Sequence, residues 1–599
     1  MNTLKKLLKA YFQYFYYFYS HLRYRIFISL TLSLFVGIMD GLGLAMFIPL
    51  LQMVDTNSPS KGGENMGNMS FIVDIFNYFG ISLTLNVVLA IIFVFFTIKG
   101  ILKFSEGYAR IIYEQLFIRI IRSRNISGLS NFSYNVFVNS DIGRIQNTFS
   151  GEVEKVNQAY RYYFFSFQYG IFVFVYISMA FFTNPRFAIF VAIGGFLTNL
   201  IFRRLHKLTK SISKKITIDS HTFQSLIIQK VSFFKYLKST GLIHKYANKL
   251  LQANDKIQDS QKRAGLISAI LGSVREPLTI LVVVLVILIQ VNYYSMSVAA
   301  IILSLLLFYR GLVSLMSTQS YWNLFLGVSG SLTNMSQFNE ELKAGKEKVG
   351  TTPFKGFSDK LVLNDVSFYY EDTSILDSIS LSIKKNETIA IVGESGSGKT
   401  TLLNVLTGLI KPLKGSVLID SKDLEILNKE AFQQRIGYIT QEPFIFNDTI
   451  FNNVTFWDSP TPENKKRLNE ALEKASILDF VKDQPLQEEA MLGNNGINVS
   501  GGQKQRLSIA RELYKEVDFL FMDEATSALD SETEKLIQEN IEKLRGKYTI
   551  IIIAHRLSTI KDVDRIILLN KGRVQDTGTF EELLSKSTSF RKMVDLQAF

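Results

Sequence analysis

The eight residues Gly393–Thr400, GESGSGKT, decide the fold of the second part of this 599-residue chain. They match the pattern GxxxxGK[ST] and follow residues 387–392, a mostly apolar run that is typical of a buried strand. An apolar helix is expected directly after them, which completes the strand–loop–helix context of a phosphate-binding loop. Glycines let backbone N–H groups surround phosphate oxygens, Lys399 reaches the terminal phosphates, and Thr400 offers a hydroxyl to Mg²⁺. The motif therefore predicts an α/β domain that binds a nucleoside triphosphate.

Two acidic residues stand at the end of another expected strand. The run VDFLFMD, Val517–Asp523, is largely apolar up to its final carboxylate, and Glu524 follows directly. In a phosphate-loop enzyme an aspartate at this place holds Mg²⁺. A glutamate beside it can polarise a water molecule for attack on the γ-phosphate. The alternative is a pair of solvated acids at a strand end, and the upstream phosphate loop favours the catalytic interpretation.

Five further segments accompany the phosphate loop. They are VSFYY with Tyr370, YITQEP with Gln441, VSGGQKQR at Val499–Arg506, SALD ending in Asp530, and IIIAHRLS with His555. In this order they resemble the adenine-stacking aromatic, the Q-loop, the signature, the D-loop and the switch histidine of ATP-binding cassette (ABC) proteins. Val499 stands where the signature usually has leucine. The resemblance covers residues 360–599 strongly and implies an ATP-binding cassette there.

In this family two cassettes pack head to tail. The resemblance therefore implies that ATP on the phosphate loop of one copy meets Ser500, Gly501 and Gly502 of another, whose open backbone can donate to the γ-phosphate. It also implies that Glu524 is the general base, that His555 holds the γ-phosphate or the attacking water, and that Gln441 senses Mg²⁺. The expected catalytic residues are Glu524, His555 and Gln441, and the expected Mg²⁺ residues are Thr400, Gln441 and Asp523. The expected ATP-binding residues are Tyr370, Gly393, Glu394, Ser395, Gly396, Ser397, Gly398, Lys399, Thr400, Thr401, Gln441, Ser500, Gly501, Gly502, Gln503, Asp530 and His555.

One residue departs from the family pattern. Asn494, in the segment GNNG, stands where exporters of this type usually carry a glutamate that links the cassette to the membrane domain. The departure bears on that coupling and leaves the hydrolytic residues intact.

The first part of the chain contains six apolar stretches of membrane-spanning character. A transmembrane helix needs about 20 mostly apolar residues. The predicted spans are Ile26–Val54, Leu85–Leu102, Tyr160–Phe182, Phe187–Phe202, Ala264–Val291 and Met296–Phe325. This layout and the segment FSYNVFVNSDIGRI resemble the exporter-type membrane domain of ABC proteins. The predicted fold is thus an α-helical six-span transmembrane domain followed by an α/β P-loop ATP-binding cassette.

The loop charges predict the orientation of the spans. Residues 204–264 carry 13 Lys and Arg against 3 Asp, whereas residues 55–79 carry a single basic residue, Lys61. Basic residues accumulate on the cytoplasmic side, so both termini and the cassette are expected in the cytoplasm, with a bacterial inner membrane as the expected location. The segments 103–159 and 204–264 are expected as cytoplasmic helical extensions joined by short crossing pieces. Asn125–Arg144 is predicted to hold one crossing and Ser220–Phe233 the other.

The predicted organisation has four parts. Residues 1–25, rich in Tyr and Phe, are expected to form an interfacial helix, because amphipathic rings favour the headgroup level. Residues 26–326 form the six-span domain, 327–359 a linker and 360–599 the cassette. Phe71–Phe79, in the outer loop, has two interpretations, a short amphipathic helix on the membrane surface or a plain turn into the second span.

The net charge of +13 divides unevenly between the two halves. Residues 1–350 hold 35 basic and 16 acidic residues, and residues 351–599 hold 31 and 37. The basicity therefore belongs to the membrane half, where cytoplasmic charge near anionic lipid accounts for much of it. Nucleic acid is not an expected partner. The absence of cysteine excludes disulfides and thiolate metal sites.

Ionisable residues within the spans are the candidates for substrate contact. Such residues are costly in a membrane and usually face a cavity or a partner. One interpretation is internal pairing, for example of Asp40 with Lys99 or Arg310. The other is a basic lining of Lys99, Arg275 and Arg310 that binds an anionic headgroup, such as the diphosphate of a polyprenyl-linked glycan.

One cassette with six spans resembles a half-transporter. A second copy would supply the second half, and the intact hydrolytic motifs favour a homodimer over an unequal pair. The expected function is ATP-driven alternating access with a lipid-linked or amphipathic substrate. Phe71–Phe79 and Phe233–Thr240 resemble segments of bacterial flippases of lipid-linked oligosaccharides. A lipid A-type flippase, an exporter of peptides or drugs, a nucleotide-gated channel and an exporter-shaped importer stay open as alternatives.

Overall fold

The structure is a computed structural model of the chain, and it divides into two compact units. One consists of Met1–Phe132 and Asn139–Lys346, the other of Ser133–Val138 and Glu347–Phe599. Both are described here except for residues 1–12, 48–49, 51–77, 79, 81–83, 184, 295–297, 371–372, 524–534, 536–538, 540–541, 555–559 and 598–599.

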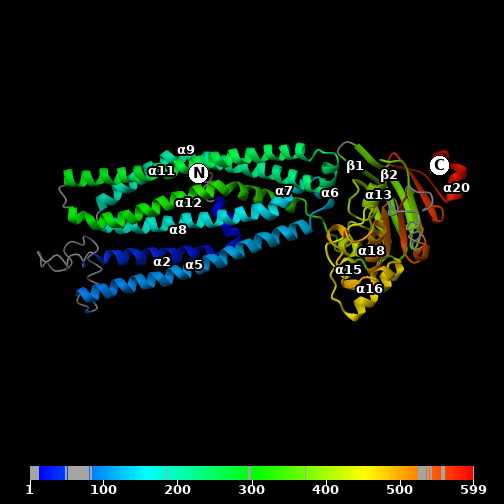
Figure 1. The fold of residues 1–599 in the computed structure, drawn as a ribbon, viewed down its shortest axis with the longest axis horizontal. Helices are drawn as coiled ribbons and strands as arrows, with labels where there is room; N and C mark the ends of the chain where they lie inside the picture. The colour runs from blue at the N-terminus through cyan, green and yellow to red at the C-terminus, as the bar shows by residue number, and fades with distance from the viewer. Residues whose placement is uncertain are drawn as a thin grey trace. The chain divides into compact units, whose positions relative to one another are not determined.

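Six long helices form the first unit (Figure 1). They are α2 (Arg25–Ala45), α5 (Leu85–Ser130), α8 (Val153–Thr183), α9 (Pro185–Ser232), α11 (Ile243–Tyr294) and α12 (Val298–Ala344). Each contains all or most of one predicted span. Among the described residues, four helical stretches are long and apolar enough to cross a membrane, namely Arg25–Ala45, Leu85–Ser130, Ile142–Phe182 and Ile243–Ile289.

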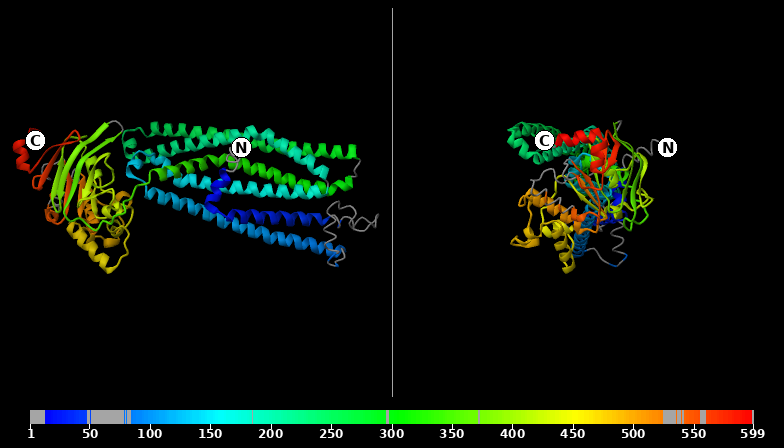
Figure 2. Two further views of the ribbon diagram at one scale, coloured as in Figure 1. Left: turned by 180° about the vertical axis from the view of Figure 1, so that it is seen from behind. Right: turned by 90° about the vertical axis from the view of Figure 1, so that its right-hand side faces the viewer.

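Apart from α2, these helices are longer than the hydrocarbon core of a membrane is thick. With 46 residues, α5 extends about 70 Å at 1.5 Å per residue, against a hydrocarbon core of about 30 Å. Helices α5, α9 and α11 thus continue into the segments 103–159 and 204–264, where extensions were expected. Helix α2 packs on α5, α8 on α12 and α9 on α11, and the left view in Figure 2 shows α2 beside α5.

The two crossing pieces differ in how well the sequence located them. Within Asn125–Arg144 the chain forms α6 (Tyr134–Val138), which clusters with the second unit, and then enters α7 (Ile142–Asn147) and a π-helix, η2 (Thr148–Glu152). The other prediction, Ser220–Phe233, is wrong because α9 continues to Ser232. The short crossing helix is α10 (Phe234–Ser239).

The misplacement of the second crossing has a local cause. Thr222 lies in the predicted crossing, but its hydroxyl donates to the carbonyl of Ile218 at 3.3 Å and stays within the helix. Neither glycine nor proline interrupts α9 there, and the chain turns only around Phe233 and at Gly241, whose φ is 72°.

The N-terminal aromatic segment packs into the bundle. Residues 13–22 are helical, and Tyr14, Phe18 and Leu22 are buried in a cluster with residues of α5, α8 and α12. Tyr16 and Tyr19 on the other side are exposed. Only one side of this helix is therefore open to an interface, while the other belongs to the core of the first unit.

Two other predicted segments are the linker 327–359 and the outer-loop segment Phe71–Phe79. The predicted linker 327–359 begins as the end of α12, which runs to Ala344. Phe71–Phe79, apart from the exposed Tyr78, lies outside the described residues.

The second unit is an α/β domain with two sheets. The larger has the order β10-β9-β3-β8-β7-β6, parallel except for β10. Its strands are β3 (Thr388–Val392), β6 (Ile436–Ile439), β7 (Phe519–Asp523), β8 (Thr549–Ile553), β9 (Arg565–Asn570) and β10 (Arg573–Gly578). The smaller, antiparallel sheet has the order β2-β1-β4-β5, with β1 (Lys360–Tyr370), β2 (Thr373–Lys384), β4 (Lys414–Ile419) and β5 (Lys422–Asp423).

Two hydrophobic cores lie on opposite faces of the larger sheet. Ala390 and Val392 of β3 point into one core, and Ile389 and Ile391 point into the other, as expected for alternating side chains. All five residues of β3 are buried, which explains why the strand before the phosphate loop is so apolar.

Helices of the second unit divide between these cores. Helix α13 (Lys399–Leu406) packs in the core with Ile389, and α18 (Gly501–Tyr514) packs in the core with Ala390. The remaining helices are α14 (Lys429–Gln433), α15 (Ile450–Thr455), α16 (Pro462–Lys474), α17 (Leu478–Lys482), η3 (Gln487–Glu489), η4 (Asn494–Gly496), α20 (Phe580–Lys586) and α21 (Thr588–Gln597). The predicted combination of a helical membrane unit and an α/β cassette is confirmed.

Candidate functional site

The phosphate loop connects β3 to α13 in the predicted context. Its lysine is buried, and the Lys399 ammonium donates to the carbonyls of Gly393 at 2.9 Å and Glu394 at 3.0 Å. A Cβ at Gly393 would lie 2.2 Å from the carbonyl oxygen of Leu569, and Gly398 has a φ of 101°. Glycine is therefore required at both positions for the loop to curl tightly.

The loop also fits the nucleotide and Mg²⁺ that the sequence implies. Within the described residues, the Ser397 hydroxyl is buried without a hydrogen-bond partner. Thr400 is exposed in the first turn of α13. A buried unpaired hydroxyl, a lysine and a helix N-terminus together suit phosphate oxygens, and an exposed threonine hydroxyl suits a hard cation.

Asp523 reaches the same edge of the sheet as the phosphate loop. It ends β7 and aligns with Ile553 of β8, which aligns in turn with Ile391 of β3. Because these strands are parallel, their carboxyl ends meet at one edge. Tyr438 of β6 lies close by, and burial, followed by the charge of Asp523, raises the pKa of its phenol. Sequence reasoning did not identify Tyr438.

Three expected site residues, Glu524, Asp530 and His555, lie outside the described residues. Glu524 directly follows Asp523 along the chain, and His555 comes two residues after the end of β8. The remaining Mg²⁺ candidate, Gln441, is exposed just after β6. Tyr370 is 38% exposed at the end of β1, with its ring 4.9 Å from that of Phe368.

The signature segment begins a helix whose N-terminus is open. Ser500 caps α18, since its hydroxyl accepts from the N–H of Gln503 at 3.3 Å, while the Gln503 amide oxygen accepts from the N–H of Ser500 at 2.8 Å. Gln503 thus has a structural role, which the spacing S-x-x-Q could have indicated. A Cβ at Gly501 would meet no atom within 4 Å. The start of α18 therefore has room for another molecule beside Gly501.

A second residue that sequence reasoning missed is Arg511, which is fully buried on α18. Its Nε donates to the carbonyl of Asn453 at 2.6 Å, and its Nη1 donates to the carbonyl of Phe444 at 3.0 Å. Its guanidinium stacks 4.5 Å from the centre of the Phe444 ring. Arg511 therefore ties the segment that follows Gln441 to the signature helix.

The three candidate cations of the spans have different surroundings. Lys99 of α5 forms an ion pair with Asp40 of α2 at 2.5 Å, and the Tyr176 phenol of α8 also donates to Asp40. Internal pairing is thus the outcome for Lys99.

Arg275 and Arg310 differ from Lys99 and from each other. Arg275 is buried on α11 and donates to the Ser320 hydroxyl at 2.5 Å and to the carbonyl of Met316 at 3.3 Å. Arg310 of α12 is exposed and has no ion pair with any described residue.

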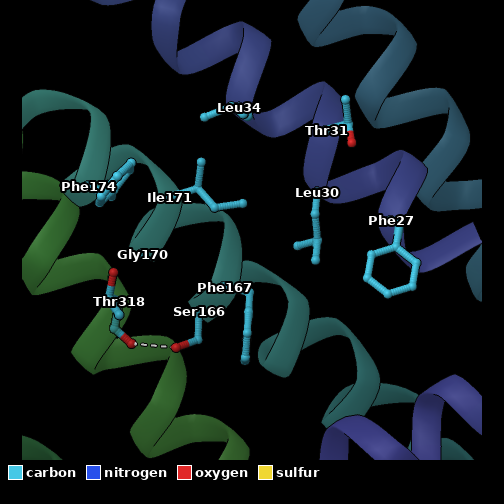
Figure 3. Close-up of a pocket in the computed structure, with 10 residues that line it drawn as sticks. All are labelled: Phe27, Leu30, Thr31, Leu34, Ser166, Phe167, Gly170, Ile171, Phe174 and Thr318. Carbon is cyan, nitrogen blue, oxygen red and sulfur yellow. Dashed lines mark hydrogen bonds between the residues drawn. The ribbon is translucent and has the colours of Figure 1, made fainter. Parts of the chain in front are cut away.

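Described residues of the first unit line two hollows. One of about 550 Å³ lies between α2 and α8, with a single residue from α12 (Figure 3). It is lined by Phe27, Leu30, Thr31, Leu34, Ser166, Phe167, Gly170, Ile171, Phe174 and Thr318. The Ser166 hydroxyl donates to the carbonyl of Thr318 and is thereby satisfied within the protein. The other lining side chains are mostly apolar. The other hollow, of about 510 Å³, lies between α11 and α12.

Comparison with known families agrees with this arrangement. The ABC transporter transmembrane region matches residues 26–315, and the ABC transporter domain matches residues 376–527. The chain belongs to the ABC transporter family. It has the half-transporter architecture of an integral membrane ABC exporter, with one membrane region and one ATPase cassette that binds ATP.

Relatives of this ABC exporter include a heterocyst differentiation protein and lipid A-core flippases. The heterocyst differentiation ATP-binding protein HepA of Nostoc sp. is 28% identical over 77% of this chain and 76% of its own length. ATP-dependent lipid A-core flippases of Syntrophus aciditrophicus and Alkalilimnicola ehrlichii are each 40% identical, over about two fifths of this chain and of their own lengths. A solved bacterial Atm1-family ABC exporter with ATP bound covers 96% of this chain at 20% identity with a TM-score of 0.77, which shows a shared fold.

Proposed function

We propose that two copies of this ABC exporter hydrolyse ATP to flip an anionic lipid across a bacterial inner membrane, with a lipid-linked oligosaccharide as the preferred substrate. Arg310 is the observation that carries the proposal. It is exposed on α12 near the middle of a predicted span, without an ion pair to any described residue. A lone cation at this depth is costly unless it faces a cavity or an anionic partner.

The other two candidate cations have a different role in this proposal. Lys99 is paired with Asp40, and Arg275 donates to Ser320 and Met316. These contacts hold α2 to α5 and α11 to α12. Arg310 is then the residue whose guanidinium can form two parallel hydrogen bonds to phosphate oxygens.

The hollow in Figure 3 suits the hydrocarbon chain of such a lipid. Its lining is mostly Phe, Leu and Ile side chains of α2 and α8. A chain that moves from the bilayer into this hollow leaves one apolar medium for another, so it gains packing contacts but no hydrophobic free energy. Selection among lipids must therefore depend on the headgroup, which in this proposal binds to Arg310.

The homodimer has two supports. The phosphate loop adjoins α13 and the signature begins α18, and these helices pack on opposite faces of one sheet. A second chain would bring its signature to the phosphate loop. In addition, Phe233, Phe234 and Tyr236 at α10 are each more than half exposed, which suits contact with another protein surface.

In the proposed hydrolytic site, phosphate oxygens would take the place of the two carbonyls that Lys399 now contacts. Thr400, Asp523 and Gln441 would hold Mg²⁺, which when bound draws charge from the phosphate oxygens. Glu524 would take a proton from the attacking water, and His555 would orient it. Ser500, Gly501 and Gly502 of the second copy would donate to the γ-phosphate from the open end of α18.

The ATP-bound dimer would be closed, and hydrolysis would separate it by placing two anions at the interface. Tyr134 of α6 lies near Tyr370 and Tyr438, and the segment 133–138 clusters with the cassette. This segment is therefore a route by which cassette movement would reach the membrane helices. The second route would be α10, in place of the segment near Thr222. Asn494, in η4, would take part in this coupling without the negative charge of the glutamate that exporters of this type usually carry.

The second candidate is a lipid A-type flippase, because proteins named lipid A-core flippases match this chain at 40% identity. Both candidates have phosphate-bearing lipids as substrates. The test therefore uses both kinds of lipid with the purified protein in vesicles.

We expect ATP-dependent translocation of a fluorescent polyprenyl diphosphate oligosaccharide. Arg310→Gln should raise the half-stimulating lipid concentration about tenfold, the value of one charge-assisted contact, and Arg310→Lys should recover part of it. Glu524→Gln should abolish ATP turnover while ATP stays bound. Translocation of lipid A alone would favour the second candidate, and stimulation by a peptide or drug alone would refute both.

A further inference from the structure

The groove between α11 and α12 has a lining that the proposed diphosphate site does not use. Its volume is about 510 Å³, within the usual range of about 300–1,000 Å³ for ligand pockets. It is lined by Glu276, Ile280, Tyr309, Leu312, Val313, Met316, Ser317, Ser320, Tyr321 and Leu324. We propose that it binds the sugar next to the diphosphate of a lipid-linked glycan, an inference that rests on the proposed function.

Aromatic rings supply the apolar side of this groove. Tyr309 is 63% exposed, so its ring is available to a ligand. The Tyr321 ring stacks on Phe165 at 4.8 Å and on Tyr169 at 5.5 Å, so it forms a fixed part of the groove wall. A pyranose ring packs its C–H face on an aromatic ring, so the exposed ring of Tyr309 can hold a sugar from one side.

A carboxylate supplies acceptors for the sugar hydroxyls. Glu276 of α11 is exposed and has neither an ion pair nor a hydrogen bond to any described residue. It lies within a predicted span, where an unpaired carboxylate usually faces a ligand or a cavity. An ionised carboxylate accepts hydrogen bonds through two oxygens and therefore suits adjacent hydroxyls of one sugar ring.

A hydroxyl on the opposite side is oriented by a buried cation. The Arg275 guanidinium donates to the Ser320 hydroxyl oxygen at 2.5 Å. This contact uses a lone pair of Ser320 and leaves its proton to donate to a sugar oxygen. The groove thus offers a donor at Ser320, an acceptor at Glu276 and aromatic rings between the two helices.

The charges distinguish this groove from the diphosphate site. Glu276 repels a phosphate, so an anionic group is disfavoured within the groove. Arg310, however, directly follows Tyr309 along α12, and neighbouring side chains on a helix point about 100° apart. A diphosphate on Arg310 would therefore place the attached sugar beside Tyr309, in the order in which the lipid carries the two groups.

The experiment compares two tritiated lipids, polyprenyl diphosphate and polyprenyl diphosphate with one hexose, on the full-length protein. Binding is measured by scintillation proximity in detergent, and ATPase stimulation is measured in vesicles. We expect tighter binding of the hexose lipid by the wild type. Glu276→Gln should weaken hexose-lipid binding about tenfold, and Tyr309→Leu about three- to tenfold.

The sugar-free lipid provides the matched comparison. Its affinity should stay unchanged in both variants, whereas Arg310→Gln should weaken both lipids. Phe104→Leu, which removes an even more exposed ring from α5 outside the groove, should change the affinity for neither lipid.

Three outcomes would overturn the inference. Equal shifts for the two lipids, or no shift, would show that the groove does not contact the sugar. Binding of the cation ethidium that Glu276→Gln abolishes, without a change for the hexose lipid, would assign the groove to cationic amphiphiles. Failure of both lipids to bind the wild type would refute the proposed function as well, and that result is distinct from a loss of sugar discrimination alone.

Discussion

Replacement of Arg511 by methionine should destabilise the cassette strongly although the residue touches no nucleotide. Methionine is apolar and of similar length, so the variant removes the hydrogen bonds while much of the side-chain volume stays. In the native cassette, Arg511 donates to the carbonyls of Asn453 and Phe444, and its Nη2 donates to the Asn453 side chain at 3.2 Å. The Asn453 carbonyl lies in the last turn of α15, where helix carbonyls lack partners within the helix.

The magnitude follows from those acceptors. Two buried carbonyls would lose their donors at about 1–3 kcal/mol each. The Asn453 side-chain oxygen would still accept from the N–H of Phe446 at 2.8 Å, so its loss is smaller. Removal of a buried cation also relieves its own desolvation cost, which offsets part of the total. We expect a net loss of about 3 kcal/mol in the free energy of unfolding.

Tryptophan fluorescence offers a direct assay. The chain has two tryptophans, Trp322 in the helical unit and Trp457 in the cassette. Trp457 donates to Asp448 at 2.7 Å and lies 5.1 Å from the ring of Phe446, within the segment that Arg511 holds. In a Trp322→Phe background, the urea midpoint of Trp457 emission therefore reports on this segment.

Arg545→Met provides the control, because Arg545 forms an exposed ion pair with Asp564 at 3.1 Å. Such pairs contribute about 0–1 kcal/mol. ATP turnover should fall with Arg511→Met, since the segment after Gln441 would no longer be fixed to α18. A loss under about 1 kcal/mol, or one equal to that of Arg545→Met, would refute the reasoning.

Three other predictions concern separate parts of the chain. Asp40→Asn should lower the thermal midpoint of the purified protein, because Lys99 would lose its ion-pair partner at a cost of about 3–5 kcal/mol. The double variant Asp40→Asn with Lys99→Met should recover most of the lost stability, and no recovery would argue against the ion pair. Burial, together with Arg124, which donates to its ring at 3.0 Å, lowers the pKa of His21. Protons then bind the unfolded state more readily than the folded state, so this contribution to stability should be complete above about pH 6.5 and should fall as the pH drops toward the folded pKa. Thermal midpoints measured across this pH range should vary less for His21→Gln than for the wild type. Gly398→Ala should abolish binding of a fluorescent ATP analogue, because φ at Gly398 is 101° and a Cβ there would lie 2.8 Å from the carbonyl oxygen of Ile375. Unchanged affinity would contradict the phosphate-loop geometry described above.

Local patterns located the phosphate loop, Asp523 and the signature segment at the strand and helix ends where the structure has them. The phosphate loop, Asp523 and the signature each combine a short motif with one strand or helix, so spacing along the chain is enough to locate them. The same argument explains the six long helices, whose apolar runs are continuous. The second crossing was misplaced because a polar stretch without glycine or proline remains helical, and its end depends on the turn at Gly241.

Residues that act through distant contacts could not be predicted in this way. Arg511 and Asn453 are 58 positions apart, and nothing in the sequence near either one indicates the other. Tyr438 and Asp523 lie on adjacent strands of one sheet but are 85 positions apart along the chain. Such residues become visible only when strand order and helix packing are known.

The sequence by itself determined which chemical groups this protein has available, that is, a phosphate loop, two adjacent carboxylates after an apolar run and three cations within the predicted spans. The tertiary structure decided what those cations do. Lys99 pairs with Asp40, Arg275 is buried against Ser320, and Arg310 is exposed. The physical reason is that the cost of a charge depends on its solvation and its partners, and both are supplied by helices far away along the chain.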